Sequence, residues 1–295
     1  MEAASVQVTT VRSATLPDLD EVIIAPIGDV QLDPVLRGQP RSCDVDRFKR
    51  HIDWLMKQKN AYFMGFGDYV DVASPSNRAN LKAVTLYDNV RAALDEQAYM
   101  AVDEMKGILK GTEGRWLGLL EGHHYWEFED GTTTDTKLAE FLKAPHLGSS
   151  ALVEVKFEAR GKHGSPKFVI YGTHGSGAGG AAGMLNKLRR LATTFSQADV
   201  LLMGHYHIKP ADKIHDLYVD FGPKKARLKH RNRIIAGTGG WLKGYMLNSR
   251  RGNTPRGSYV EQGTMPPVTL GAPILRARPR YDHDGYSDVD LEISL

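Results

Sequence analysis

Two stretches of similar design, VIIAPIGD at residues 22–29 and AYFMGFGD at residues 61–68, decide the fold. Each is a short, continuous apolar run that ends in glycine and aspartate, as expected of a buried strand that stops at a functional loop. Between them, residues 44–57 carry apolar side chains at three-to-four spacing, which is typical of an amphipathic helix. The sequence therefore predicts a β-α-β unit with an acidic residue at the tip of each strand.

Three further apolar runs end in histidine. Residues 115–120 lead to Gly122-His123-His124, residues 167–171 lead to His174, and residues 199–203 lead to Gly204-His205-Tyr206-His207. In open α/β sheets, ligands bind at the carboxyl ends of the strands. Five strand ends that carry Asp or His therefore predict one shared site. The remaining predicted elements are one long or two shorter helices over 81–110, a half-buried strand over 151–158 and a helix over 184–195.

Composition and length exclude several classes of protein. The chain has 295 residues, of which 41% are hydrophobic and 25% charged, so gross disorder and a fibrous structure are excluded. Cys43 is the only cysteine, which excludes an internal disulfide framework and a cysteine-based zinc ribbon. No apolar run reaches the roughly 20 residues that cross a bilayer, and no signal peptide is evident. We expect a soluble, cytoplasmic protein with no membrane partner.

The side chains at the strand ends are metal-ligand types. Carboxylate oxygen and imidazole nitrogen together suit zinc, manganese, iron and other first-row cations, and a carboxylate can bridge two such ions. Two ions about 3.5–4 Å apart clamp a phosphoryl group and lower the pKa of a bound water. The pattern therefore indicates metal-dependent chemistry on a phosphate ester. One structural zinc is a weaker interpretation, because the ligands come from widely separated strand ends.

The order of these blocks resembles the calcineurin-like metallophosphoesterase family, whose blocks read D-x-H, G-D-x-x-D, G-N-H-(D/E), a lone H, and G-H-x-H. The resemblance covers about residues 20–245. It implies an α/β, layered βαβ-type sandwich of two mixed sheets flanked by helices. We expect a single domain over 1–295, in which residues 246–295 form a C-terminal extension of loops and short strands packed on the core. The resemblance also implies two divalent cations, with Mn²⁺, Zn²⁺, Fe²⁺ and Ni²⁺ as candidates, and the ligands Asp29, Gln31, Asp68, His123, His174, His205 and His207.

The resemblance also assigns roles to these residues. It places Asp29 and His207 on the first ion, Asp68 between the two ions, and the remaining three histidines on the second ion. His124 resembles the family's histidine that faces the phosphate and assists departure of the leaving oxygen, and Asp71 resembles its orienting carboxylate. Asp71 is also a candidate helix N-cap, because aspartate is a favoured capping residue. The implied reaction is hydrolysis of a phosphomonoester or phosphodiester by a hydroxide that bridges the metals.

Two positions depart from the family pattern. Gln31 stands where the family has a histidine ligand, and its amide oxygen is a poorer donor for a transition metal, so a weak first site or a harder ion such as manganese is expected. His123 stands where the family has asparagine, and an alternative alignment makes His123 the catalytic residue. These departures keep a second hypothesis open, in which the protein is a catalytically impaired nucleic-acid-binding protein on the same fold.

Two other stretches have both a functional and a structural interpretation. The glycine-rich run 175–180 lacks a P-loop ending, and we interpret it as a flexible wall of the site, with phosphate binding at the following helix start as the alternative. The basic stretch 213–233 follows the last ligand block directly, so we expect it to lie near the metals. It is a candidate for binding nucleic acid or a nucleotide beside a phosphate-ester site, and a solvated hairpin is the alternative.

Overall fold

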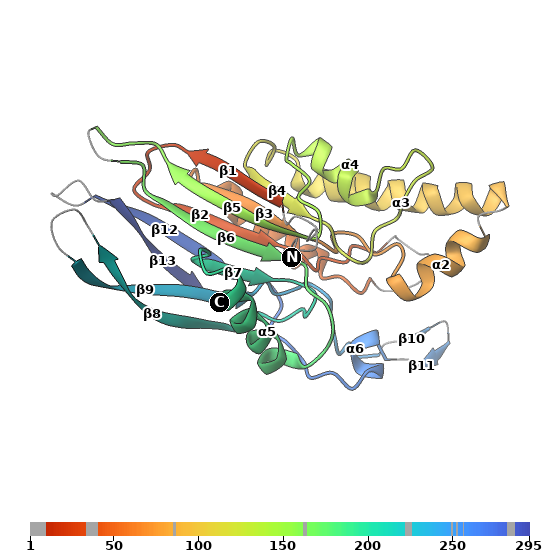
Figure 1. Cartoon of the computed structure of the whole chain (residues 1–295). Helices are drawn as coiled ribbons and strands as arrows, with labels where there is room; N and C mark the ends of the chain where they lie inside the picture. Colours follow the sequence, from red (N-terminus) through yellow and green to blue (C-terminus); the bar gives the residue numbers. More distant parts are fainter. Residues whose placement is uncertain are drawn as a thin grey trace, which may run out of the picture.

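The computed structural model describes residues 10–33, 41–84, 87–161, 164–221, 226–248, 250–251, 253–255, 257–281 and 287–295. Within them, two mixed β-sheets pack face to face and helices cover both outer faces (Figure 1). The predicted α/β sandwich of two mixed sheets is therefore confirmed.

The five-stranded sheet contains the predicted β-α-β unit. Its strand order is β13-β12-β2-β3-β4. The elements are β2 (Val22–Ile27), β3 (Ala61–Phe66), β4 (Trp116–Leu120), β12 (Ile274–Tyr281) and β13 (Ser287–Ser294), with helix α1 (Val45–Met56) between β2 and β3. Strands β2, β3 and β4 are parallel, whereas β12 runs antiparallel to both β2 and β13. The three parallel strands therefore end at the same edge.

The six-stranded sheet has the order β1-β5-β6-β7-β9-β8. Its strands are β1 (Thr10–Leu16), β5 (Ser150–Phe157), β6 (Lys167–Thr173), β7 (Val200–Met203), β8 (Ala211–Phe221) and β9 (Ala226–Gly237). Strands β6, β7 and β9 are parallel, β5 is antiparallel to β6, and β8 is antiparallel to β9. The carboxyl ends of β6 and β7 therefore lie side by side.

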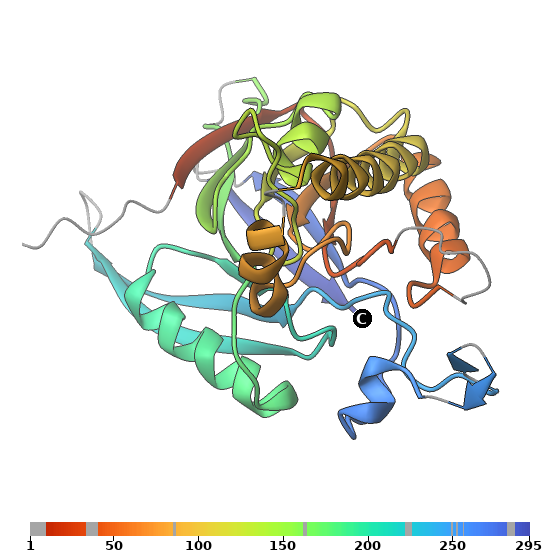
Figure 2. The same cartoon turned by 90° about the vertical axis from the view of Figure 1, so that its right-hand side faces the viewer.

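Helices cover the outer faces, as a view rotated by 90° shows (Figure 2). Helices α1, α3 (Asp88–Leu109) and α4 (Thr134–Phe141) pack on the five-stranded sheet, and α5 (Gly180–Thr194) packs on the other sheet. The smaller elements are α2 (Pro75–Val84), α6 (Tyr259–Gln262), β10 (Arg250–Arg251) and β11 (Thr254–Pro255). None of the helices in the described part of the chain has the length and apolar character needed to cross a bilayer.

Apolar burial explains both interfaces. In α1, the Asp44 side chain caps the helix by accepting a hydrogen bond from Arg47 N, and Phe48 and Ile52 bury the inner face against the sheet. Between the sheets, Phe66 from one layer and Phe168 from the other belong to one buried cluster. Each fully buried large apolar side chain contributes about 1.5–3 kcal/mol, so the two sheets are held together mainly by this cluster.

Several elements differ from the sequence-based predictions. Of the two alternatives predicted over 81–110, one long or two shorter helices, the structure has two helices, α2 and α3, but α2 already begins at Pro75. Strand β1 and helix α4 were not predicted. The described part of 246–295 supplies β12 and β13, of eight residues each, so this stretch completes a sheet by pairing with β2. The single-domain organisation stays a prediction.

Candidate metal centre

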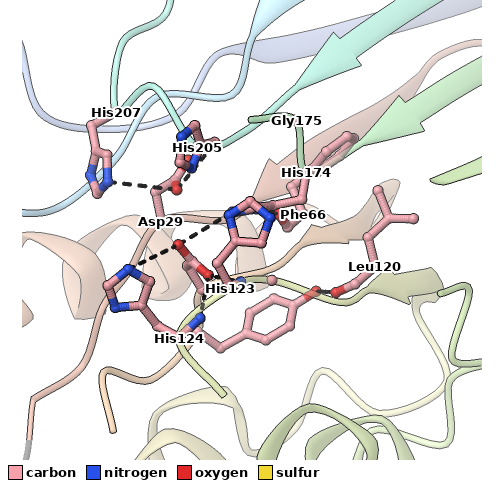
Figure 3. Close-up of polar contacts among 12 residues, drawn as sticks. Asp29, Phe66, Leu120, His123, His124, His174, Gly175, His205 and His207 are labelled. Atoms are coloured by element: carbon pink, nitrogen blue, oxygen red, sulfur yellow. Dashed lines mark hydrogen bonds and ion pairs between the residues drawn. The ribbon is translucent and has the colours of Figure 1, made fainter. Parts of the chain in front are cut away.

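The strand ends of both sheets meet at one place. Asp29 follows β2, Asp68 follows β3 and His123 follows β4, all from the five-stranded sheet. His174 follows β6 and His205 follows β7, from the six-stranded sheet. Figure 3 shows the side chains of Asp29, His123, His174 and His205 close together. His205 N donates a hydrogen bond of 3.1 Å to Asp29 Oδ1, which joins two residues that lie 176 positions apart in the chain.

Two overlapping groups of side chains have the geometry to hold metal ions. His123, His174 and His205 form one group, and Asp29, Asp68 and His174 form the other. Within each group, one ligand atom per residue lies within 4.8 Å of the others. His174 belongs to both groups, so two ions held here would be neighbours. The predicted ligand His207 lies outside both groups, with its Nε2 atom 3.8 Å from Asp29 Oδ1.

Backbone carbonyl groups select the ring nitrogens that face the site. His174 Nδ1 lies 2.6 Å from Phe66 O, and His205 Nε2 lies 3.1 Å from Gly177 O. A carbonyl oxygen only accepts, so each of these nitrogens carries the proton and donates. The opposite nitrogen of each neutral ring is then free to bind a cation. Metal-binding histidines are commonly oriented by such a bond to a carbonyl.

Unpaired polar atoms test whether ions fit here. Asp29 Oδ2, His174 Nε2 and His207 Nδ1 are buried and have no hydrogen-bond partner among the described residues. His174 Nε2 is 3.3 Å from Asp68 Oδ2, at ion-pair distance but without hydrogen-bond geometry. Buried polar atoms are normally satisfied. The orphaned atoms of Asp29 and His174 therefore fit a divalent cation, whereas the His207 nitrogen that lies toward Asp29 is Nε2 and not the unpaired Nδ1.

Asp68 is fixed by the loop that follows β4. Its Oδ1 atom accepts hydrogen bonds from the backbone N–H groups of His123 and His124, the latter at 3.0 Å. The loops approach so closely that a Cβ atom on Gly122 would lie 2.0 Å from Asp68 N. A glycine is therefore required at position 122, and it lets one carboxylate oxygen stay bonded to the loop while the other faces the histidines.

Five predicted ligands share an unusual backbone conformation. Positive φ angles between 47° and 69° are found at Asp29, Gln31, Asp68, His205 and His207. Non-glycine residues adopt this left-handed region at a cost of about 1–3 kcal/mol each, and such strain concentrates at functional sites. The hydrogen bond from Gln31 N to Asp68 O, of 2.8 Å, helps to hold two of these turns together. The strained turns direct the side chains at the strand ends into one site.

Burial and neighbouring charges shift the ionisation of the ligands. Burial raises the pKa of Asp29 to about 8 and lowers that of His207 to about 4. For His123, burial and the charge of His174 lower the pKa to about 4. Burial disfavours the charged forms of Asp68 and His174, but the attraction between the two charges outweighs it. The pKa of Asp68 is therefore lowered, and that of His174 is raised to about 9. Two of the histidines are therefore neutral at pH 7, as ligation requires.

His124 and Asp71 form a pair beside these ligands. His124 Nδ1 lies 2.7 Å from Asp71 Oδ1, and His124 Nε2 lies 4.0 Å from Asp68 Oδ2. Burial lowers the pKa of His124, but the hydrogen bond to Asp71 and the charges of both carboxylates outweigh burial and raise it. The pair is thus built to keep a proton on His124 at the edge of the site, where general acid chemistry requires one.

Three residues that support the site were not predicted. Asp135 Oδ2 accepts a hydrogen bond from Gly122 N of 3.0 Å, and burial raises the pKa of Asp135 to about 7. Arg78 donates to the carbonyl of His123, and Tyr69 donates to Leu120 O at 2.8 Å. Asp135 and Arg78 stand in no motif block, and Tyr69 occupies a variable position of the G-D-x-x-D block, so the sequence carried no signal for their roles.

The glycine-rich run 175–180 lies against the last ligand block. Tyr206 donates from its hydroxyl to Ser176 O at 3.1 Å, and His205 contacts Gly177 O as described above. This run forms the loop between β6 and α5 and ends where α5 begins, at Gly180. It therefore lies beside the candidate metal centre, whereas phosphate binding by its backbone stays a prediction.

The position expected for the basic stretch 213–233 is wrong. The stretch forms the hairpin of β8 and β9, and β9 is parallel to β7, so the hairpin runs toward the opposite end of the sheet from His205 (Figure 1). Arg231 bonds to Asp199 at the start of β7, and Arg233 bonds to Asp216 at 2.7 Å. Lys224 and Lys225 lie outside the described residues. Binding of nucleic acid or a nucleotide by this stretch stays a prediction.

Comparisons with known proteins complete the description. No protein-family model and no curated protein matches the sequence. Among solved structures, the chain is similar to Vps29 from Chaetomium thermophilum, at 13% identity over 92% of this chain and 95% of that chain, with a TM-score of 0.32. It is also similar to the NAD nucleotidase NadN from Haemophilus influenzae, at 13% identity and a TM-score of 0.36. That alignment covers 92% of this chain and 49% of the nucleotidase.

Proposed function

We propose that the protein is a metal-dependent phosphoesterase of the calcineurin-like type, which hydrolyses a phosphomonoester or phosphodiester. The observation that carries this proposal is the pair of overlapping ligand groups that share His174, together with the His124–Asp71 pair beside them. A purely structural metal site needs no general acid next to it. The combination of ligands with a positioned, proton-carrying histidine is the arrangement that phosphate-ester cleavage requires.

The donor set decides which ions are proposed. Imidazole nitrogens and carboxylate oxygens suit Mn²⁺, Zn²⁺, Fe²⁺ and Ni²⁺. When bound, such ions polarise the phosphoryl oxygens and lower the pKa of water. Asp29 and Asp68 would hold one ion, and His123 and His205 offer nitrogen donors for the second. His174, which has one free nitrogen, would bind one of the two ions. In this proposal, Asp68 is the residue that places the two ions next to each other, because a carboxylate can bridge two cations.

The chain's own acid is proposed to act on the leaving group. Asp71 keeps the proton on His124 by its hydrogen bond of 2.7 Å and its negative charge. His124 would donate this proton to the leaving oxygen as the ester bond breaks. General acid catalysis of this kind typically contributes about 10²–10⁴-fold in rate. Such a contribution grows as the leaving group becomes more basic.

The experiment is hydrolysis of p-nitrophenyl phosphate and bis-p-nitrophenyl phosphate by metal-stripped protein, with Mn²⁺, Zn²⁺, Fe²⁺ or Ni²⁺ restored one at a time. We expect metal-restored turnover of one ester, and its loss in Asp68→Asn. Asp53→Asn, on the exposed side of α1, is the matched control and should keep full activity. Turnover that needs no metal, or that persists in Asp68→Asn, would contradict the proposal.

A further inference from the structure

A cavity beside the metal centre has no role in the proposed reaction. It has a volume of about 280 Å³ and is lined by Arg47, His51 and Trp54 from α1 and by Lys209 and Trp241 from two loops. None of the predicted metal ligands lines it. Lys209 also lines an adjoining cavity of about 390 Å³. Trp241 N donates to Asp29 O at 3.1 Å, so the cavity lies at the same end of the sheets as the metal centre.

The cavity carries uncompensated positive charge. Lys209 is half-buried, and no ion pair or hydrogen bond of its ammonium group is found in the part of the chain that the structure describes. Burial and the nearby charge of Arg47 both lower the pKa of Lys209. Arg47 itself has one carboxylate partner, Asp44, at 3.2 Å. An anion in the cavity would therefore be attracted by the charges of Lys209 and Arg47, and Lys209 has no counter-charge among the described residues.

Unpaired ring nitrogens point to the same ligand chemistry. Trp241 is 1% exposed, and its Nε1 atom has no hydrogen-bond partner among the described residues. An indole N–H group only donates, so it needs an acceptor. His51 Nε2 is also buried and unpaired. Leaving a buried donor unsatisfied costs about 1–3 kcal/mol, and an acceptor that came within hydrogen-bond distance of these atoms would remove that cost.

We propose that this cavity is a binding site for a phosphate group, either as inorganic phosphate or as the terminal group of a nucleotide. Phosphate oxygens only accept at neutral pH apart from one weak donor, which complements Lys209, Arg47 and the indole of Trp241. Trp54 is 39% exposed and offers a ring face for the remainder of a larger ligand. The site would be distinct from the metal centre in its residues and would bind without a metal.

The test is titration of the metal-stripped 295-residue protein with inorganic phosphate, AMP and adenosine, followed by calorimetry and by intrinsic tryptophan fluorescence, to which Trp54 and Trp241 contribute. We expect phosphate and AMP to bind and adenosine to bind at least tenfold more weakly than AMP. Lys209→Met and Arg47→Met should each weaken phosphate binding at least tenfold, which is about 1.4 kcal/mol. Lys49→Met, an exposed α1 lysine outside the cavity, is the control and should bind as the wild type does.

The outcomes separate the two ligand sources and the two proposals. Tighter binding of AMP than phosphate, with the difference lost in Trp54→Ala, identifies a nucleotide site, and equal binding identifies a phosphate site. Unchanged affinity in both Lys209→Met and Arg47→Met, with thermal melting showing intact folds, would overturn the proposal. Absence of binding up to about 10 mM ligand, where even weak sites are detected, would also overturn it. Because no metal is present, these results do not depend on hydrolytic activity.

Discussion

The Nδ1 atom of His124 lies 2.7 Å from Oδ1 of Asp71, so the carboxylate holds the ring and favours its charged form. Removing that charge in Asp71→Asn should lower the pKa of His124. If protonated His124 is the acid, activity falls as pH rises through its pKa, and in the variant this fall should occur at lower pH. The pH dependence of kcat for an alkyl phosphate ester, whose leaving oxygen needs a proton, measures the shift. A profile identical to that of the wild type would remove Asp71 from the orienting role.

Leaving-group dependence tests His124 itself. In His124→Ala, we expect hydrolysis of an alkyl phosphate ester to fall by about 10²–10⁴-fold, because the alkoxide needs a proton. Hydrolysis of the p-nitrophenyl ester should fall much less, because its leaving group is already a weak base. Parallel assays of both esters at fixed metal concentration measure the ratio. Equal losses on the two esters would show that His124 acts in binding and not as the acid.

Metal binding should stabilise the fold through His174, which both ligand groups share. A divalent ion at 100 times its Kd adds about 2.7 kcal/mol to the free energy of unfolding, so the Tm of the wild type should rise when Mn²⁺ or Zn²⁺ is added. His174→Ala should lose most of this rise. His215→Ala, in the β8–β9 hairpin, is the matched control and should keep it. Differential scanning calorimetry with and without chelator provides the measurement.

Asp135 makes the stability of the metal-free protein depend on pH. Burial raises its pKa from 3.8 to about 7, so the folded state holds a proton that the unfolded chain releases above pH 4. Stability therefore falls as pH rises from about 4 to 7 and stays reduced above. Asp135→Asn carries no charge and keeps an acceptor for Gly122 N. At pH 8 we expect it to be more stable than the wild type by about 1–4 kcal/mol, with little difference at pH 4. Urea denaturation of both proteins at pH 4 and pH 8 measures the difference in the free energy of unfolding. The same difference at both pH values would contradict the prediction.

Close approach of the loops makes Gly122 irreplaceable. A Cβ atom there would lie 2.0 Å from Asp68 N, so Gly122→Ala must displace Asp68 or its loop. We expect a loss of about 1–3 kcal/mol in stability and weaker metal binding. Gly107→Ala is the comparison, because a Cβ atom at this position in α3 meets nothing within 4 Å. It should stabilise the protein by about 0.5–1 kcal/mol. Metal titration and thermal melting of both variants distinguish the steric clash at position 122 from the general effect of replacing a glycine.

The sequence predicted the strand ends well because burial leaves a strong local pattern. The runs before Asp29 and Asp68 are continuously apolar and become β2 and β3, and both are almost entirely buried. The histidines after β4, β6 and β7 come to the same site because these strands pair parallel to a neighbour. The rule that ligands bind at the carboxyl ends of parallel strands anticipates this. The sandwich of two sheets followed from the family resemblance and not from the periodicity.

Other features could not be predicted, because they depend on contacts between distant segments. The turn of the basic hairpin away from the metals depends on β9 pairing parallel to β7, which no local pattern shows. Asp135 stands in the first turn of α4, where aspartate usually stabilises the helix end. Its side chain instead accepts a hydrogen bond from Gly122 N in the loop after β4. The pairing of β12 with β2 joins residues about 250 positions apart.

The division of ligands between the two sheets has a mechanical consequence. Asp29 and Asp68 belong to one layer and His174 to the other, so a single ion held by these three residues would cross-link the layers at one end. The turns that carry these residues would then be tied across the interface. The metal-bound and metal-free proteins should therefore differ most in how readily this end of the sandwich opens, and amide hydrogen exchange would locate that difference in the loops after β3 and β6.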